Sequence, residues 1–84
     1  MSLKNIEFMT TLGCHLCEQA WAMLEYLLKT NPDIADQVSL IKVEISEDDT
    51  LLEKYGIRIP VLVSEKGELG WPFEFEELEE WLAN

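Results

Sequence analysis

The apolar positions of this chain follow two spacings, one typical of β-strands and one typical of α-helices. Short apolar runs predict strands, most clearly where apolar and polar residues alternate and β-branched side chains are frequent. These runs are Lys4–Thr10, Val38–Ile45, Ile59–Val63 and, more briefly, Leu69–Trp71. The glycine-containing segment Glu65–Glu68 separates the last two runs and predicts a hairpin turn.

Between the first two strands, apolar residues recur every three or four positions and predict one long helix over Cys14–Lys29. The apolar stripe of this helix consists of Cys17, Ala20, Trp21, Leu24, Leu27 and Leu28. The segment Thr30–Asp33 contains Pro32, and a proline is common shortly after a helix end. We therefore expect the helix to end there and the chain to cross over to the second strand.

Two further helices are predicted in the second half of the chain. Ser46 is expected to be the N-cap of a short helix that ends near Tyr55, with Gly56 as its C′ residue. Asp48 and Asp49 fall in the first turn of this helix, where negative charge is favourable. The last helix places four apolar residues on one face: Phe75, Leu78, Trp81 and Leu82.

The predicted elements follow the order β-α-β-α-β-β-α. A strand, a crossover helix and a second strand form a parallel pair, and the final hairpin adds an antiparallel pair. We therefore expect an α/β fold with a four-stranded mixed sheet and helices packed on it. A chain of 84 residues has room for a single domain, which we place over residues 1–84.

The charge of the chain narrows its range of partners. Seventeen acidic and six basic residues give a formal net charge of −11. Nucleic acids and anionic membranes bind clustered lysine and arginine, so we expect neither as a partner. No apolar run is long enough for a transmembrane helix, and Met1–Lys4 lacks the apolar region of a signal peptide. We therefore expect a cytoplasmic protein, whose cysteine pair serves redox or metal chemistry rather than structural cross-linking.

The only two cysteines, Cys14 and Cys17, lie three residues apart where the first strand gives way to the first helix. This spacing brings two sulfur atoms within bonding distance across the first turn of a helix. Unpaired N–H groups and the helix dipole stabilise a thiolate there. We predict that Cys14 is the exposed nucleophile of a thiol–disulfide exchange and that Cys17, on the buried stripe, is the resolving thiol. In the alternative reading, Cys17 is simply a small apolar residue of the core.

Three features together resemble the glutaredoxin/thioredoxin superfamily over essentially the whole chain. They are the Cys14–Cys17 motif at the first strand-to-helix junction, the Ile59-Pro60-Val61 segment that opens the third strand, and the order of the elements. The chain looks most like small glutaredoxin-like proteins with Gly-Cys-His-Leu-Cys-Glu and Leu-Gly-Trp-Pro-Phe, here residues 13–18 and 69–73. The resemblance implies a thioredoxin-like fold and a dithiol–disulfide oxidoreductase of electron transport and cell redox homeostasis.

The resemblance also implies roles for residues that would lie around the two cysteines. His15 lies between the cysteines, where a protonated imidazole would stabilise the thiolate; an exposed side chain without influence is the alternative. Pro60 matches a proline that is cis in the family, and Ile59 would offer its backbone N–H and C=O to an extended substrate. Thr11 stands where glutathione-binding members carry a lysine, so the resemblance implies that it contacts substrate. Arg58 could pair with a substrate carboxylate, while the many acidic residues also offer it ion pairs within the chain.

The region that binds glutathione in related proteins is altered. Glutathione-binding members carry a Gly-Gly pair followed by a small residue and an Asp, whereas Gly70-Trp71-Pro72-Phe73 stands here. Glutathione is therefore kept only as an alternative ligand. We expect a monomeric enzyme without a dissociable cofactor. Its substrates would be disulfide-containing proteins bound near Pro60, and its reductant would be glutathione or a thioredoxin reductase.

Two other classes of function fit parts of the pattern. A structural zinc site needs four cysteine or histidine ligands and this chain has three candidates, so no metal site is predicted within one chain. An iron–sulfur cluster shared by two chains through Cys14 is one alternative. The other is a non-catalytic interaction module of thioredoxin fold, with an exposed aromatic surface around Trp71 and Phe73.

Overall fold

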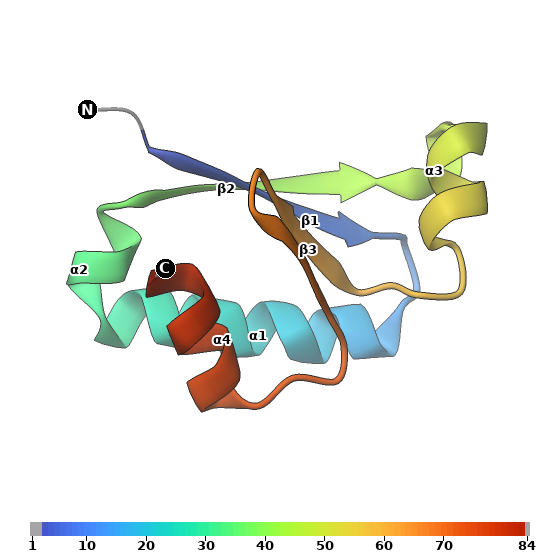
Figure 1. The fold of residues 1–84 in the computed structure, drawn as a ribbon. Coiled ribbons are helices and arrows are strands. Elements are labelled where there is room, and N and C mark those ends of the chain that lie inside the picture. The colour runs from blue at the N-terminus through green and yellow to red at the C-terminus, as the bar shows by residue number, and fades with distance from the viewer. Residues whose placement is uncertain (1–2, 84) are drawn as a thin grey trace.

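The computed structural model describes residues 3–83, in which one sheet carries helices on both faces (Figure 1). The predicted domain limits, Met1 and Asn84, lie outside the described residues. In chain order the elements are β1 (Lys4–Thr10), α1 (His15–Thr30), α2 (Pro32–Ala35), β2 (Val38–Glu44), the single 3-10 turn η1 (Ile45–Glu47), α3 (Asp49–Tyr55), β3 (Val61–Ser64), β4 (Gly67–Gly70) and α4 (Phe75–Ala83).

The four strands are arranged in the order β2-β1-β3-β4. β1 and β2 are parallel, in a register that runs from the pair Lys4–Val38 to the pair Thr10–Glu44. β3 is antiparallel to both β1 and β4. The predicted α/β fold with a four-stranded mixed sheet is therefore confirmed. Because β1 and β2 are parallel, their carboxyl ends lie side by side at the end of the sheet where α1 begins.

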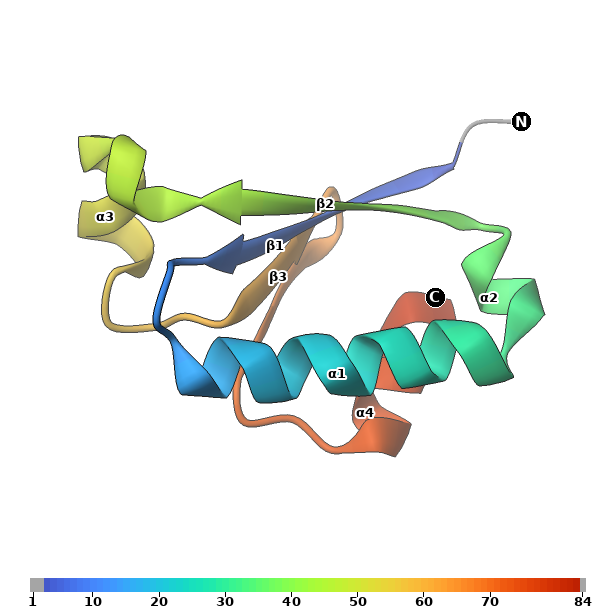
Figure 2. The same ribbon diagram turned by 180° about the vertical axis from the view of Figure 1, so that it is seen from behind.

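α1 and α4 cover one face of the sheet, as both views show (Figures 1 and 2). The predicted stripe of α1 supplies four buried residues: Cys17, Ala20, Leu24 and Leu27. They pack with Ile6 and Phe8 of β1, Leu62 of β3, and Leu78 and Leu82 of α4. Each such large apolar side chain stabilises the fold by about 1.5–3 kcal/mol relative to its exposure to water.

α3 lies against the opposite face, at the end of the sheet near the start of α1 (Figure 2). A second buried cluster forms there from Met9, Ile45, Tyr55 and Val61. Neighbouring strand residues point to opposite faces, so β1 places Phe8 in the first cluster and Met9 in the second. The end of the sheet that carries the cysteines is thus packed on both sides.

The start of α3 differs from the sequence prediction. Ser46 is not its N-cap; it lies in η1, and the N-cap is Asp48. Asp48 Oδ1 accepts hydrogen bonds from the N–H groups of Thr50 at 2.9 Å and Leu51 at 3.2 Å. The Ser46 N–H is already bound at 3.0 Å to the carboxylate of Glu44, which draws Ser46 into the preceding turn.

The short helix α2 was not predicted. The long helix ends at Thr30, near its expected end, and Asn31 then starts α2 by accepting a hydrogen bond from the Ile34 N–H at 3.3 Å. Pro32 is the first residue of α2, a position where its missing N–H and fixed φ are favourable. Pro32 therefore opens a helix here as well as following one.

The limits of the third and fourth strands differ from those predicted from the sequence. β3 begins at Val61 rather than Ile59, because Pro60 has no N–H for the ladder. β4 runs over Gly67–Gly70 rather than Leu69–Trp71, and Gly67 has a φ of 141° next to the turn. Gly56 is the C-cap of α3 with a right-handed φ of −48°, rather than the predicted C′ residue.

Candidate active site

The cysteine motif lies at the junction of β1 and α1, as predicted. The loop of residues 11–13 joins the two elements, and Gly13 has a φ of 81°, which a residue with a Cβ rarely adopts. Cys14 has extended φ and ψ angles of −86° and 103° and is the N-cap of α1, whose first residue is His15. The local sequence thus places one sulfur at a helix N-terminus and the other one turn inside it.

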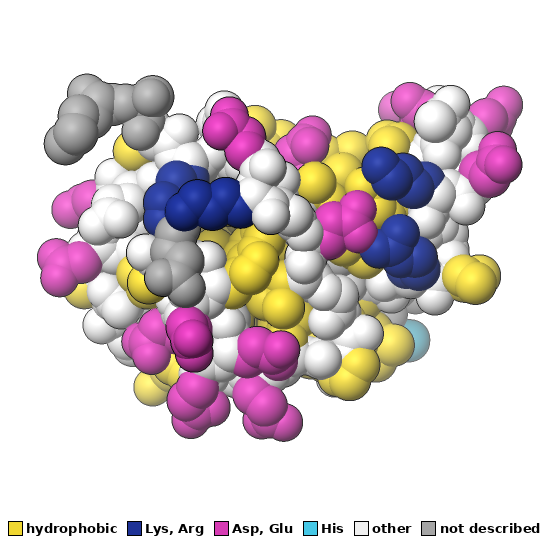
Figure 3. All heavy atoms as spheres, in the orientation of Figure 1, with side chains coloured by type: hydrophobic (Ala, Val, Ile, Leu, Met, Phe, Trp, Pro, Cys, Tyr) yellow, Lys and Arg dark blue, Asp and Glu magenta, His cyan; other side chains and the backbone are white. Residues whose placement is uncertain are grey.

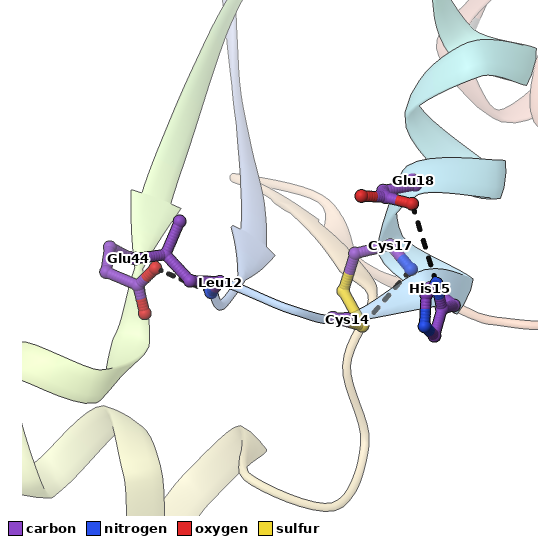
Figure 4. The surroundings of a disulfide bond; sticks show 6 residues. All are labelled: Leu12, Cys14, His15, Cys17, Glu18 and Glu44. Carbon is purple, nitrogen blue, oxygen red and sulfur yellow. Dashed lines mark hydrogen bonds and ion pairs between the residues drawn. A yellow bond between two sulfur atoms is a disulfide. The ribbon is translucent and has the colours of Figure 1, made fainter.

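Cys14 and Cys17 form a disulfide, with their Cα atoms 5.2 Å apart (Figure 4). Cys14 Sγ accepts a hydrogen bond from the Cys17 N–H at 3.1 Å, so the sulfur is itself the side-chain cap of α1. Cys14 is partly exposed, whereas Cys17 is only 3% exposed. Cys14 is therefore the more accessible of the two cysteines, and Cys17 is covered by the core.

His15 is directed to solvent and to a neighbouring acid. Its side chain is 90% exposed, and Nδ1 lies 3.7 Å from Glu18 Oε2 in the same turn of α1 (Figure 4). The glutamate is also largely exposed. Solvent screens such charges strongly, and the predicted influence of His15 on the Cys14 thiolate stays a prediction.

Ile59 and Pro60 lie in the loop that leads into β3, and the bond between them is cis, as the resemblance implied. Pro60 is buried, and its carbonyl oxygen accepts a hydrogen bond from the Trp71 N–H at 3.1 Å. The Ile59 side chain packs against the same buried cluster as Cys17. The Ile59 N–H donates to the Tyr55 carbonyl at 3.1 Å, so one of the two backbone groups expected to hold substrate is engaged within the chain.

Arg58 makes contacts within the chain. Its guanidinium forms an ion pair with Glu68 of β4, lies 5.2 Å from the centre of the Tyr55 ring, and donates to the Lys54 carbonyl at 3.3 Å. The hydrogen bond from Arg58 and a second one from the Tyr55 hydroxyl hold the pKa of Glu68 below its ordinary value. The intramolecular ion pair is therefore present, and the contact with a substrate carboxylate stays a prediction.

Glu44, the last residue of β2, belongs to the site although the sequence reasoning did not single it out. Its carboxylate accepts a hydrogen bond from the Leu12 N–H at 3.1 Å (Figure 4) and another from the Ser46 N–H at 3.0 Å. A hydrogen bond from the Thr11 side chain, followed by those from Ser46, holds the pKa of Glu44 below its ordinary value. Thr11 thus contacts Glu44, and its predicted contact with substrate is untested. The available signal was an acidic residue at the end of a strand parallel to β1.

A cavity of about 400 Å³ opens beside the disulfide, on the side of β2. Both cysteines line it, together with Trp21, Lys42 and Glu44. The Lys42 Nζ lies 4.2 Å from the centre of the Trp21 ring, which packs edge-on against Phe8. Trp21 therefore joins the core, as predicted, and also forms part of the wall beside the disulfide.

The segment that replaces the glycine pair of glutathione-binding proteins lies next to Pro60. The Trp71 ring packs edge-on against Phe73, with 5.0 Å between ring centres. Phe73 is only 5% exposed, so it does not contribute to the exposed aromatic surface that would support the interaction-module alternative. The Trp71–Pro72 bond is also cis, which was not predicted.

Charged side chains are unevenly placed. Acidic side chains gather over α4, away from the start of α1 (Figure 3).

Among residues 3–83, no three His, Cys, Asp or Glu side chains are grouped as metal ligands. In the same part of the chain, every helix is too short or too polar to cross a membrane.

The chain is similar to proteins of known structure over nearly its full length. Residues 5–83 match the family described as Glutaredoxin-like domain (DUF836). The X-ray structure of target protein XcR50 from X. campestris is 34% identical, with a TM-score of 0.73 over 93% of this chain and 95% of that chain. Protein Ne2328 from Nitrosomonas europaea is 24% identical, with a TM-score of 0.72 over 96% and 93% of the two chains. A search of curated proteins found no match.

A more distant likeness is to thioredoxin O2 from Arabidopsis thaliana in the oxidized state. It is 21% identical, with a TM-score of 0.64 over 98% of this chain and 74% of that chain. At this identity the comparison shows the fold alone, which is the thioredoxin-like fold that the sequence predicted. With the family match over residues 5–83, the chain therefore belongs to the glutaredoxin-like domain family.

Proposed function

We propose that the protein is a dithiol–disulfide oxidoreductase with Cys14 as nucleophile and Cys17 as resolving thiol. The Cys14 thiolate attacks one sulfur of a substrate disulfide, that S–S bond breaks, and the other substrate sulfur leaves as a thiolate. The Cys17 thiolate then attacks Cys14 Sγ and displaces the second substrate sulfur. The substrate gains two electrons, and the protein is left with the Cys14–Cys17 disulfide.

The observation that carries this proposal is the capping position of Cys14. Its sulfur receives the Cys17 N–H at 3.1 Å at the positive end of α1, which favours the thiolate over the thiol. The unequal exposure of the two cysteines supports the order of attack, because only Cys14 is open to a large substrate. The family itself supports redox chemistry in general terms.

Protein disulfides are the proposed substrates. Three large apolar side chains near the site are exposed: Leu12 (92%), Leu16 (48%) and Ile57 (102%). They flank the disulfide and the Ile59–Pro60 bond in sequence, and apolar surface of this kind favours a protein partner over a small polar one. A substrate strand at Ile59 would bind the carbonyl oxygen, and would have to displace Tyr55 to reach the N–H.

The proposed mechanism needs a reductant but no dissociable cofactor. A thiol or dithiol donor, such as glutathione or a thioredoxin reductase, returns the Cys14–Cys17 pair to the reduced form. We propose a monomer that works in the cytoplasm, where the glutathione pool keeps the substrate disulfides transient. Glutathione remains an alternative ligand only, because Trp71 stands where related proteins keep a second glycine.

The first test is the reduction potential of the Cys14–Cys17 pair, followed by tryptophan fluorescence in a series of dithiol redox buffers. We expect one reversible two-electron transition between about −270 and −120 mV. The Cys14→Ser variant should lose all turnover, whereas Cys17→Ser should accumulate a mixed disulfide with substrate. Absence of the transition in every buffer, or turnover by the Cys14→Ser variant, would reject the proposal.

A further inference from the structure

The loop that carries Cys14 has little support of its own. It leaves the sheet after Thr10, its central side chain Leu12 is 92% exposed, and Gly13 has a positive φ. The pair Thr10–Glu44 is the last of the β1–β2 ladder. Beyond that pair, the Glu44 side chain continues the contact between the two segments. Its Oε1 accepts a hydrogen bond from the Leu12 N–H at 3.1 Å, although the two residues are 32 positions apart in sequence.

The second oxygen of the same carboxylate is engaged as well. Glu44 Oε2 accepts the Ser46 N–H at 3.0 Å and so caps η1, which fixes the direction of the carboxylate. The Thr11 side chain provides another hydrogen bond from the loop. One carboxylate therefore binds the loop before Cys14 through one oxygen, as Figure 4 shows for Leu12, and the turn after β2 through the other.

We propose that Glu44 is the positioning residue of Cys14, a role that rests on the proposed exchange reaction. By holding Thr11 and Leu12, it sets where the loop delivers Cys14 to the N-terminus of α1. Attack on a disulfide needs the sulfur in line with the S–S bond, and small displacements of a reacting group lower rates steeply. A small reagent that alkylates any accessible thiolate has no such requirement.

The charge of Glu44 acts in the opposite direction to its tethering. Glu44 lines the same cavity as both cysteines, so its carboxylate opposes a thiolate there. Removing the charge would make a thiolate easier to form, while removing the tether would make it worse placed. The proposal therefore predicts slower exchange together with alkylation that is unchanged or faster, a combination that general loss of structure would not produce.

The experiment compares Glu44→Ala with the wild-type protein and with Glu47→Ala, an exposed acid of η1 that removes the same charge. The reduced proteins react with a synthetic disulfide-bridged peptide and, separately, with iodoacetamide, across a range of pH. We expect Glu44→Ala to slow exchange at the pH-independent plateau about tenfold. Alkylation should be unchanged or faster, by less than about twofold, and Glu47→Ala should match the wild type in both reactions.

Thr11→Val removes one of the tethering bonds without touching the charge. We expect it to slow exchange by about threefold, the size of one modest hydrogen bond. If Glu44→Ala does not fold, as judged by circular dichroism, the same two rates are measured in Thr11→Val and Glu44→Gln. A lower ratio of exchange to alkylation than in the wild type supports the proposal, and an unchanged ratio in both variants overturns it.

Wild-type exchange rates in Glu44→Ala would overturn the proposal. Equal losses of exchange and alkylation in Glu44→Ala would also overturn the proposal, because alkylation does not depend on how the sulfur is positioned. An equal loss of exchange in Glu47→Ala would overturn it as well, because that residue does not hold the loop. A wild-type protein that is alkylated but exchanges no disulfide would instead reject the oxidoreductase function, and the role of Glu44 with it.

Discussion

Two loops meet the disulfide region, and each is tied down by a glutamate from one edge strand of the sheet. Glu44 of β2 holds the loop before Cys14, and Glu68 of β4 holds the loop before Pro60 through Arg58 and Tyr55. β2 and β4 are the outermost strands of the sheet, so its opposite edges support the two halves of the site.

The two glutamates differ in what they bind. Glu44 accepts a backbone N–H of its loop, so it holds the chain itself. Glu68 binds the ends of side chains, and the Arg58–Glu68 pair is 46% and 31% exposed. Exposed ion pairs are screened by solvent and salt and contribute little. Both ties lie near the surface, so we infer the difference from the groups that are bound: the Cys14 loop is held through its backbone, whereas the loop of Ile59 and Pro60 is held through side chains and retains more freedom to adapt to a substrate.

The largest expected effect concerns the glycines of the two loops. A Cβ added at Gly56 would lie 2.4 Å from the Leu52 carbonyl oxygen, so the end of α3 would have to move. We expect Gly56→Ala to lower the free energy of unfolding by about 3 kcal/mol. Gly13 has open space around it but a φ of 81°, so Gly13→Ala should cost only about 1 kcal/mol.

Urea unfolding followed by circular dichroism measures both changes. Disulfide exchange by the two variants then sharpens the contrast, since Gly13 adjoins Cys14 and Gly56 does not. We expect the less destabilised Gly13→Ala to lose more activity than Gly56→Ala at a temperature where both are folded. The reverse order would mean that the Cys14 loop is not the sensitive one.

A smaller effect is expected at the second glutamate. Glu68→Gln removes the charge that Arg58 pairs with and leaves the Cys14 loop untouched. We expect about a twofold rise in KM for a protein disulfide at low salt, with kcat unchanged, and no difference at high salt. Glu65→Gln, in the exposed turn before β4, is the matched control. A large fall in kcat for Glu68→Gln would show that the tie from β4 matters for the chemical step as much as the tie from β2, and would contradict the inferred difference between Glu44 and Glu68.

Acid should weaken both ties. The pKa values of Glu44 and Glu68 are lowered in the folded protein, so each carboxylate stabilises the fold at pH values above the ordinary glutamate range. That contribution is lost as the pH falls through the lowered folded-state pKa. Thermal unfolding of the wild type and of Glu44→Gln should therefore differ by a constant amount down to about pH 5 and converge below about pH 4. A gap that widens in acid would contradict this sign.

The smallest effect is expected at His15. Its imidazole is 90% exposed and lies near Glu18 in the same turn of α1. We expect His15→Ala to change the iodoacetamide alkylation rate of Cys14 by less than about twofold at neutral pH. Glu18→Gln serves as the control that removes the neighbouring charge. A tenfold change in His15→Ala would show that the dipeptide between the cysteines, rather than the loop before them, controls the thiolate.

Much of the fold and the reactive pair follow from local patterns in the chain. The limits of β1 and the stripe of α1 come from side-chain spacing, which repeats within a few residues. The position of Cys14 at the N-cap and of Cys17 one turn later also depends only on neighbouring residues. Ser46 is not the cap because Glu44 caps the turn η1 that contains Ser46, and Asp48 supplies the side-chain oxygen that caps α3. Asn31 and Pro32 carry the signal for α2, a capping side chain followed by a proline, as well as the signal for the end of α1.

The sequence by itself determined the element order, the dithiol and its place at the start of a helix, because these depend on short-range spacing and helix-end chemistry. Only the tertiary structure decided which of the 17 acidic residues reach the site. Glu44 meets Leu12 because the parallel register ends at Thr10–Glu44, and Glu68 meets Arg58 because β4 lies at the other edge. A period of two in a strand sets which face a side chain occupies; strand order and register set which residue it meets.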